Sequence, residues 1–253
     1  MLHSLSRMVA SAAVALSLAL CMAAGASAGN LGFGPPTLDL TNRARIGTVS
    51  LTNRAADPAR FEIKVFRWAQ LLDGRMQLDP TDDAIVFPQL ITIPANETRR
   101  LRVSLLVPPG ELEKTYRIQV TEIPGFSGTT RTPAGSIAML SELKLPIFYA
   151  PLHAQIAGTI QGAGVHHGAL AFSVANTGTV HFETKHVTVT AFGSNGRVVS
   201  ARQLDGWYVL PGSRREYRLA LPNCGDIRAV TISADAGAHA EQTIDVPADA
   251  CRP

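Results

Sequence analysis

The histidines are the side chains of this sequence best suited to bind a metal ion. Six of the seven lie in the second half of the chain: His153, His166, His167, His181, His186 and His239. Imidazole is a good ligand for copper and zinc, and His181 and His186 lie around one predicted turn. No two of them are two residues apart on one strand, however, and no Asp or Cys partner is nearby. Dispersed surface histidines are therefore the simpler interpretation, and a copper or zinc site the alternative.

Catalytic signatures are missing from the sequence. It contains no G-x-S-x-G, no glycine-rich phosphate loop and no H-E-x-x-H. Asp82 and Asp83 follow Pro80 in a predicted turn. General acid–base catalysis by this pair would need a cleft and raised pKa values, so a solvated turn is the simpler interpretation. We expect no enzymatic activity, no cofactor and no resident metal.

The N-terminus has the features of a secretory signal peptide. A basic start precedes an almost wholly apolar stretch over residues 8–24, and the small-x-small sequence Ala-Ser-Ala follows at 26–28. Cleavage there removes residues 1–28. No later segment approaches the ~18 apolar residues that a membrane span needs. We therefore expect an exported protein whose mature chain does not insert into a membrane.

Removal of the leader leaves two cysteines, Cys224 and Cys251. An even number of cysteines in an oxidising compartment predicts one disulfide. Two free buried thiols are the alternative. A pair of cysteines with this spacing does not make a zinc site by itself.

The composition is that of a folded protein that does not bind nucleic acid. Hydrophobic residues make up 46% of the 253 residues and charged residues 17%, with a formal net charge of +3. Basic residues occur singly or in pairs such as Arg99-Arg100 and Arg214-Arg215. No basic patch is formed, so nucleic acid is excluded as a partner.

The elements that position these residues are short strands. Alternating or β-branched segments occur at 37–40, 46–53, 60–70, 84–95, 99–108 and 116–124, and again at 169–178, 185–193, 196–204, 215–222, 226–235 and 240–247. Turn residues such as Asp73-Gly74 and Pro108–Gly110 separate them. Strands spaced in this way predict β-sandwiches rather than βαβ units.

The two halves of the chain echo one another. "VSLTNRA" (49–55) resembles "FSVANTG" (172–178), and "ITIPANETRRLRV" (91–103) resembles "WYVLPGSRREYRL" (207–219). Both longer segments have a Pro-containing turn before a strand that starts with an Arg pair. We therefore predict two sandwich domains, 29–151 and 152–253, each of ordinary size.

One segment, "GSIAMLSELKLPIFYAP" (135–151), alternates with an incompletely polar second face. The Gly/Thr/Ser/Pro-rich stretch 121–135 precedes it. A strand with apolar residues on its accessible side suits pairing with a strand of another chain, that is, β-augmentation.

Together these segments resemble periplasmic pilus-assembly chaperones, across essentially the whole mature chain. The matching segments are "VSLTN", "VFRWAQ", "FPQLITIPANETRRLRV", "PGELEKTYRIQVTEIP", "IFYAP" and "GWYVLPGSRREYRL", in the family's order. The resemblance implies two immunoglobulin-like domains in an L shape. It also implies a location in the periplasm, pilin or fimbrial subunits as clients, and an outer-membrane usher that receives them.

In that family the last strand of the first domain is lent to a pilin that lacks its own final strand. Carried onto this chain, the lending positions are Ile137, Met139, Ser141 and Leu143. The exported metal-binding sandwich that uses the second-domain histidines remains the alternative function.

Two departures from the family concern charge. The family holds the subunit's C-terminal carboxylate with an Arg in the first strand and a Lys near the end of the lending strand. Those positions are Leu38 and Pro146 here. Lys144, two residues earlier and on the same face as Pro146, is the candidate replacement for the Lys. Arg43 or Arg45 is a weaker candidate for the second charge. The family also has an Arg just before the closing Pro for an interdomain ion pair, and that residue is Ala150 here; these departures indicate a divergent member.

Overall fold

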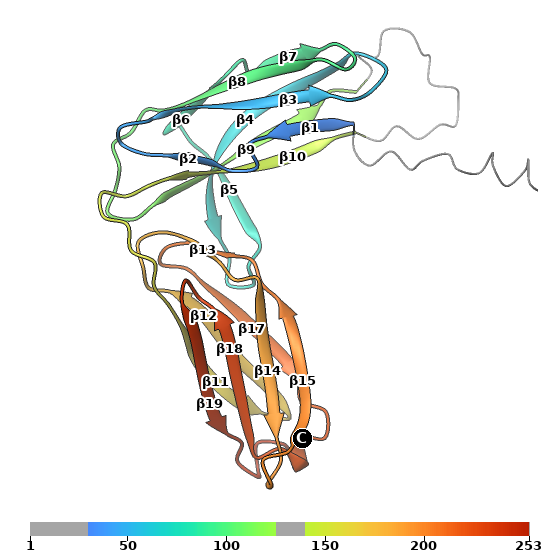
Figure 1. Ribbon diagram of the computed structural model, residues 1–253, viewed down its shortest axis with the longest axis vertical. Helices are drawn as coiled ribbons and strands as arrows, with labels where there is room; N and C mark the ends of the chain where they lie inside the picture. The colour runs from blue at the N-terminus through green and yellow to red at the C-terminus, as the bar shows by residue number, and fades with distance from the viewer. Residues whose placement is uncertain (1–29, 125–139, 253) are drawn as a thin grey trace, which may run out of the picture.

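The computed structural model of the chain describes residues 30–124 and 140–252. The predicted all-β class and L-shaped pair of immunoglobulin-like domains are confirmed (Figure 1). The predicted signal peptide and the positions Ile137 and Met139 lie outside the described residues.

The first domain is built from ten strands: β1 (Leu31–Gly34), β2 (Leu38–Leu40), β3 (Ile46–Asn53), β4 (Ala59–Gln70), β5 (Met76–Pro80), β6 (Ala84–Phe87), β7 (Leu90–Ile93), β8 (Thr98–Leu105), β9 (Lys114–Glu122) and β10 (Glu142–Tyr149). One sheet has the order β1-β3-β8-β6, and the other has the order β2-β10-β9-β4-β5, with β7 also paired to β4. Inward side chains of both sheets form one core that includes Leu51, Leu101 and Ile118.

The second domain repeats this plan with fewer strands in each sheet. Its elements are β11 (Gly158–His166), β12 (Ala169–Asn176), β13 (Phe182–Glu183), β14 (His186–Phe192), β15 (Val198–Asp205), β16 (Tyr208–Val209), β17 (Arg214–Ala220), the 3-10 turn η1 (Cys224–Asp226), β18 (Ala229–Asp235) and β19 (His239–Asp245). The sheets β11-β12-β17 and β15-β14-β18-β19 enclose a separate core that includes Leu170, Val187 and Ile232. Because β10 ends at Tyr149 and β11 begins at Gly158, we propose Pro151 as the domain boundary.

The echoed sequences occupy equivalent places in the two domains. Asn53 and Asn176 each end a strand and are buried. The Nδ2 of Asn53 donates to Ile93 O at 3.0 Å, and that of Asn176 donates to Val209 O at 2.8 Å. Each Oδ1 accepts the backbone N–H two residues later. In both domains the Asn thus satisfies buried backbone groups at a strand end.

The Pro-containing turns are equivalent as well. The backbone N–H of Asn53 donates to Glu97 O at 3.0 Å, and that of Asn176 donates to Ser213 O at 2.9 Å. Asn96 (φ 59°) and Gly212 (φ 70°) supply the left-handed residue of each turn. In each domain, the strand that ends in the buried Asn is therefore hydrogen-bonded to the Pro-containing turn.

Strand boundaries differ from the expectation at a few places. The expected strand 84–95 is interrupted at Pro88, which gives β6 and β7 in different sheets. Proline has no N–H for a ladder. Strands β1, β5, β11, β13 and β16 were not expected. In β11 a bulge at Gly162, between Gln161 and Gly164, interrupts the alternation on which such a prediction depends.

The two domains meet at an elbow, which we define by the buried side chains of Trp68, Phe148 and Leu210 with Leu78 and Tyr208 packed on them. The tip of the β4–β5 hairpin reaches across it. The side chain of Gln70 donates to Tyr208 O at 2.6 Å and accepts from Leu210 N at 3.2 Å. Glu216 N donates to Leu72 O at 2.8 Å, so the hairpin pairs with the exposed edge of β17.

Candidate functional site: the open edge of β10

Strand β10 carries an edge that is only partly used. It pairs with β9 along its whole length, from Glu142 to Tyr149. On its other side, β2 pairs in parallel with Ile147–Tyr149 only. Within the described residues, the stretch Glu142–Pro146 therefore has no strand on its outer side. Figure 1 shows this stretch beside β1, the edge strand of the facing sheet, which pairs only with β3.

Backbone hydrogen bonds show which peptide groups of β10 face outward. Ser141 O accepts from Glu122 N at 3.0 Å, so Ser141 faces β9, whereas Ala150 N donates to Leu40 O on the opposite side. Because peptide groups alternate along a strand, those of Glu142, Lys144 and Pro146 point outward. The missing N–H of Pro146 therefore leaves the ladder to β9 intact, the position at which an edge strand tolerates proline.

Apolar side chains border this open side of the sandwich. Leu143 is half-buried and packs on the first core, as does Leu31 of β1. Phe33 of β1 is 45% exposed and Leu140 is 50% exposed. Ser141 lies at the start of the edge, where its backbone N–H donates to the Glu122 carboxylate at 3.0 Å. The open side thus offers peptide groups that no strand pairs with, beside apolar surface, the combination that β-augmentation uses.

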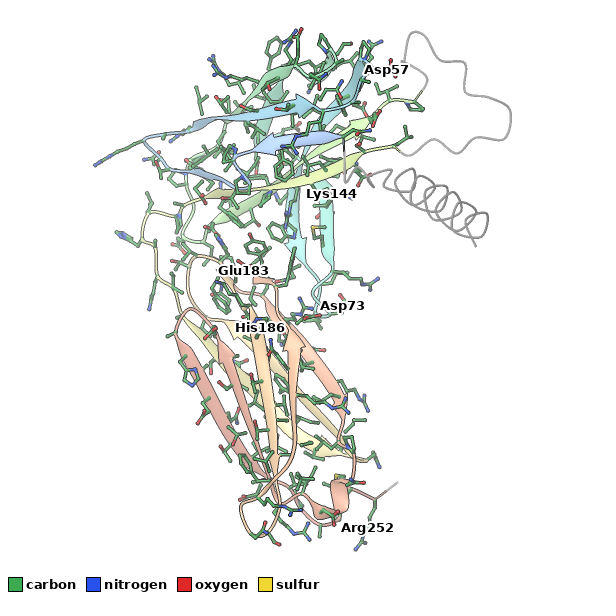
Figure 2. The ribbon with its side chains drawn as sticks, turned by 45° about the vertical axis from the view of Figure 1, so that its right-hand side comes forward. Asp57, Asp73, Lys144, Glu183, His186 and Arg252 are labelled. Carbon is green, nitrogen blue, oxygen red and sulfur yellow. A yellow bond between two sulfur atoms is a disulfide. The ribbon has the colours of Figure 1, made fainter. Side chains whose placement is uncertain are left out.

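Lys144 lies on the face of β10 that points away from the core, as the alternation predicts (Figure 2). Its ammonium group pairs with Glu142, and both side chains are partly exposed. Leu38 is buried in the first core beside Ile147, and Pro146 is buried too. Lys144 is therefore the cation that β10 itself supplies to this face.

A second cation, Arg117 of β9, was not predicted from the sequence. It lies opposite Pro146 in the register and is only 4% exposed. Its Nη1 donates to Lys144 O at 3.2 Å, and its guanidinium carbon lies 3.7 Å from the centre of the Trp68 ring. Its Nε and Nη2 are buried without a hydrogen-bond partner, and no described carboxylate pairs with it. Burial lowers the pKa of Arg117 to about 10, so the side chain is still charged at neutral pH.

One signal in the sequence pointed to Arg117. It is the charged residue of "TYRIQV", between Tyr116 and Ile118, both of which are buried in the first core. Alternation alone places such a residue on the outer face of β9, where exposure to solvent is the ordinary expectation. In the fold its guanidinium carbon lies 3.7 Å from the centre of the Trp68 ring and 6.0 Å from that of Tyr208 in the second domain, and the side chain is buried between them.

An acidic residue and a histidine join the domains beside this face. Both the backbone N–H and Nδ1 of His181 contact Glu113 Oε2, at 3.0 and 2.7 Å. The His181 ring stacks on Phe148 with 3.5 Å between centroids. This contact links the first domain to the second, whereas Ala150 has no charged side chain for an ion pair.

The remaining histidines do not converge. Among the described residues, no group of three or more His, Cys, Asp and Glu side chains could hold a metal ion. His181 is engaged with Glu113, and His186 begins β14 with its side chain exposed (Figure 2). Asp83, of the acidic turn, accepts from Tyr116 at 3.0 Å and pairs with Arg67 at 2.9 Å.

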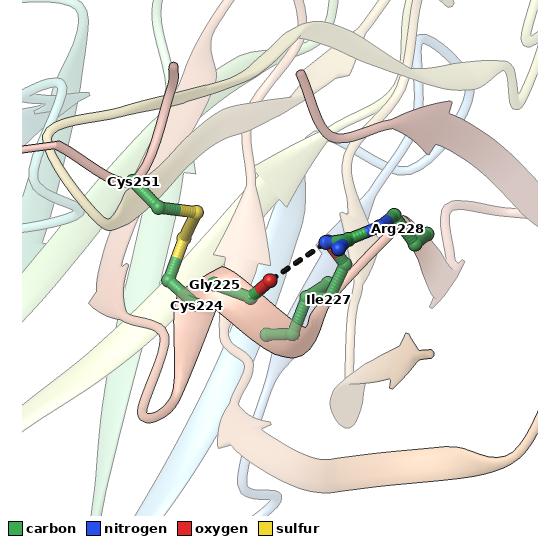
Figure 3. Close-up of a disulfide and its surroundings, with 5 residues drawn as sticks. All are labelled: Cys224, Gly225, Ile227, Arg228 and Cys251. Atoms are coloured by element: carbon green, nitrogen blue, oxygen red, sulfur yellow. Dashed lines mark hydrogen bonds between the residues drawn. A yellow bond between two sulfur atoms is a disulfide. The ribbon is translucent and has the colours of Figure 1, made fainter. Parts of the chain in front are cut away.

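The predicted disulfide is confirmed. Cys224 and Cys251 are bonded, with 5.5 Å between their Cα atoms (Figure 3). The bond ties η1 to the C-terminal residues, and Cys251 packs against the second core. Arg228 Nη1 donates to Gly225 O at 2.7 Å and closes the same turn. The disulfide is far from β10 in the fold and is structural.

Comparison with known proteins agrees with this geometry. Residues 31–155 match the profile of the pili and flagellar-assembly chaperone family, PapD N-terminal domain. The chain belongs to the pilus-assembly chaperone family. No curated protein matches it in sequence.

Solved structures show the same two-domain fold for this chaperone-family chain. A chain of the CsuC–CsuE chaperone–tip adhesion subunit complex of Acinetobacter baumannii has a TM-score of 0.59 and 17% identity, over 86% of this chain and 98% of that one. A chain of the SafA pilin–SafB chaperone complex of Salmonella enterica has a TM-score of 0.51 and 14% identity, over 88% and 99%. The CupB2 chaperone of Pseudomonas aeruginosa has a TM-score of 0.50 and 16% identity, over 85% and 99%.

None of the described helical segments of this chaperone-family chain is long and apolar enough to cross a membrane.

Proposed function

We propose that this protein is a non-catalytic periplasmic chaperone that caps pilin-like subunits with β10 and the residues just before it. The observation that carries the proposal is the unpaired outer edge of Glu142–Pro146, which lies beside β1 on the open side of the sandwich. A partner strand there would pair with the outward peptide groups of β10 that no strand of this chain occupies. In return it would have its own exposed edge covered.

Alternate side chains of the lent segment give the pairing its apolar component. We assign this role to Ile137, Met139, Ser141 and Leu143, which are alternate residues of one segment. Leu143 lies at the open side of the core and supports the assignment for the described part. Each aliphatic side chain buried in a partner groove contributes about 1.5–3 kcal/mol. Main-chain pairing adds register without requiring one partner sequence.

We further propose that Lys144 and Arg117 hold an anionic group of the client, its C-terminal carboxylate being the candidate that the family suggests. The support is their proximity, because Arg117 Nη1 contacts Lys144 O, and the lack of a carboxylate partner for Arg117 among the described residues. Guanidinium binds carboxylate through paired N–H groups. Arg117 has two such groups without a partner, and access to them requires a shift of the elbow side chains.

In this proposal an outer-membrane usher takes the subunit from the chaperone. The chaperone requires no nucleotide, metal or other cofactor. Its role is to keep an incomplete subunit folded and soluble until it is transferred.

Co-purification tests the proposal. The tagged chaperone is expressed with the pilin-like subunits of its own organism, and recovery of the subunit is measured for wild type, Met139→Asp and Val198→Asp. We expect Met139→Asp to abolish recovery, since a carboxylate would enter an apolar groove. Val198→Asp, an exposed change in the second domain, should leave recovery unchanged. Unchanged recovery with Met139→Asp, with the free chaperone still folded by circular dichroism, would reject the lending assignment.

A further inference from the structure

The second domain lacks a strand that the first domain has. In the first domain, β8 pairs with β3 on one side and with β6 on the other. Strand β17 is its equivalent, because each of the two follows the Pro-containing turn of its domain, and β17 pairs with β12 on one side. On its other side, no described strand of the second domain pairs with it. Such an open edge is available for pairing with another segment.

The tip of the β4–β5 hairpin, residues 70–75, occupies part of this edge, and we call it the clasp (Figure 1). Strand β4 pairs with β9 over only part of its length, so the hairpin projects beyond its own sheet. Glu216 N donates to Leu72 O at 2.8 Å. The guanidinium group of Arg215 lies against Gly74, where an added Cβ would be 3.1 Å from the guanidinium carbon. The first domain thus supplies a substitute for the missing strand.

The contacts of the clasp with the second domain are mainly polar. Its apolar side chains, Leu71 and Leu72, are 38% and 49% exposed rather than buried in the second domain. Asp73, at the tip (Figure 2), lines a hollow of about 570 Å³ together with residues of β11, β12 and β17. Hydrogen bonds contribute little net free energy because water replaces them, and small polar contacts between domains permit relative motion. The clasp is therefore suited to release.

The clasp is connected to the side chains that cover Arg117. Gln70 donates to Tyr208 O at 2.6 Å and accepts from Leu210 N at 3.2 Å. The guanidinium carbon of Arg117 lies 6.0 Å from the centre of the Tyr208 ring and 3.7 Å from that of the Trp68 ring. Trp68 belongs to β4, the strand that ends in Gln70. Loss of the Gln70 hydrogen bonds would therefore free Tyr208 to move away from Trp68 and uncover Arg117.

Contacts on the other side of the elbow do not involve the hairpin. Leu152 N donates to Gly110 O at 3.3 Å, and Glu113 N donates to Thr179 O at 2.8 Å. These contacts lie beside the linker that joins the domains, and Figure 1 shows the linker and the hairpin on opposite sides of the elbow. Release of the clasp alone would leave the linker side connected, as a hinge requires.

We propose that the clasp holds the elbow closed, and that its release opens the elbow and gives an anionic group of the client access to Arg117. The clasp itself does not depend on strand lending. Its control of Arg117 rests on the proposed function, in which that side chain binds the client. A client that binds only the open form would shift the equilibrium toward that form by its own binding free energy.

Fluorescence of Trp68 measures the opening in the mature protein without a client. Trp68 is 2% exposed, and Trp207→Phe leaves it as the only tryptophan. In this background, Gln70→Ala removes two hydrogen bonds of the clasp, and Glu216→Pro removes the N–H that donates to Leu72 O. Because that N–H points away from β12, proline leaves the β12 ladder intact. We expect each variant to raise the acrylamide quenching constant severalfold.

Matched variants leave the clasp contacts in place. Gln77→Ala changes an exposed glutamine of the same hairpin, whose side chain donates to Asp79. Arg218→Pro removes an N–H on the same side of β17, where no described strand pairs with it. Both should show the quenching constant of the Trp207→Phe protein. Unchanged quenching in both clasp variants, with circular dichroism showing folded protein, would overturn the proposal.

A cross-link tests the control of access to Arg117. The double variant Leu72→Cys/Glu216→Cys, at two exposed side chains, is cross-linked by a short bismaleimide in one sample and capped by N-ethylmaleimide in the other. A pilin-like subunit is then refolded from urea in the presence of each sample. We expect the cross-linked protein to recover severalfold less subunit than the capped protein, and equal recovery would overturn this part of the proposal. Recovery by neither sample would contradict the proposed function and, with it, the control of access, while the quenching result still decides whether the clasp holds the elbow.

Discussion

The guanidinium carbon of Arg117 lies 3.7 Å from the centre of the Trp68 ring, inside the elbow between the two domains. The aromatic face partly offsets the charge, but no described carboxylate neutralises it. Desolvation by burial lowers the pKa of Arg117 to about 10. A buried cation that is left without an anion costs stability, so its presence is better explained by binding than by folding.

Replacement of Arg117 by Met should therefore separate stability from function. We expect the free energy of unfolding of the free protein to stay within about 1 kcal/mol of wild type or to rise, since a buried charge is removed. Recovery of a co-expressed pilin-like subunit should fall. Urea unfolding and co-purification measure the two effects. A loss of more than about 2 kcal/mol would show instead that Arg117 is a structural part of the elbow.

Lys144→Ala should weaken subunit recovery with little change in stability. The Lys144–Glu142 pair is exposed at the surface, and such pairs contribute about 0–1 kcal/mol. The matched control is Lys64→Ala, which removes a similar exposed pair with Glu62 on β4. If both variants recover the subunit equally well, Lys144 does not hold the client.

The repeated asparagines should matter equally in the two domains. Asn53→Ala and Asn176→Ala each leave buried carbonyl groups without their donor, which costs about 1–3 kcal/mol. Asn195→Ala, in an exposed turn, should change stability by less than about 0.5 kcal/mol. Urea unfolding of the three variants checks this. A cost confined to one domain would mean that the two echoed motifs are not equivalent in energy.

Loss of the Cys224–Cys251 bond should destabilise the second domain. The bond closes a loop with a sequence separation of 27 residues, and removal of such a bond costs about 2–4 kcal/mol. The double variant Cys224→Ala/Cys251→Ala should unfold at lower urea than wild type, and reduced wild type should behave like the variant. Subunit recovery at low temperature should persist, because β10 lies in the other domain.

Stability should fall in alkaline solution because of Tyr116. Burial, and then its hydrogen bond to Asp83, raises the pKa of Tyr116 above its ordinary value near 10. Above about pH 10 the unfolded chain releases this proton while the folded chain retains it, so the free energy of unfolding decreases as pH rises. Tyr116→Phe should reduce this decrease between about pH 9 and about pH 11 in urea titrations. An unchanged slope would show that other groups cause it.

Local sequence alone determined much of the fold. Alternation predicted most strands, because a strand buries every second side chain. The echo of "VSLTN" and "FSVAN" predicted two similar domains, and the structure shows Asn53 and Asn176 in the same role. Two cysteines left after an export signal predicted their bond, since the number of possible pairings was one.

Other features were decided by tertiary structure. The outward direction of the Pro146 peptide group depends on which side of β10 pairs with β9, and its partner strand is distant in sequence. The burial of Arg117 depends on Trp68 and Tyr208, which come from distant parts of the chain, because alternation by itself places Arg117 on an outer face of β9. Cross-strand neighbours in β1, β3, β6 and β8 are likewise set by register. Long-range pairing, not local pattern, fixes such neighbours, so the sequence supplied the residues and the fold brought them together.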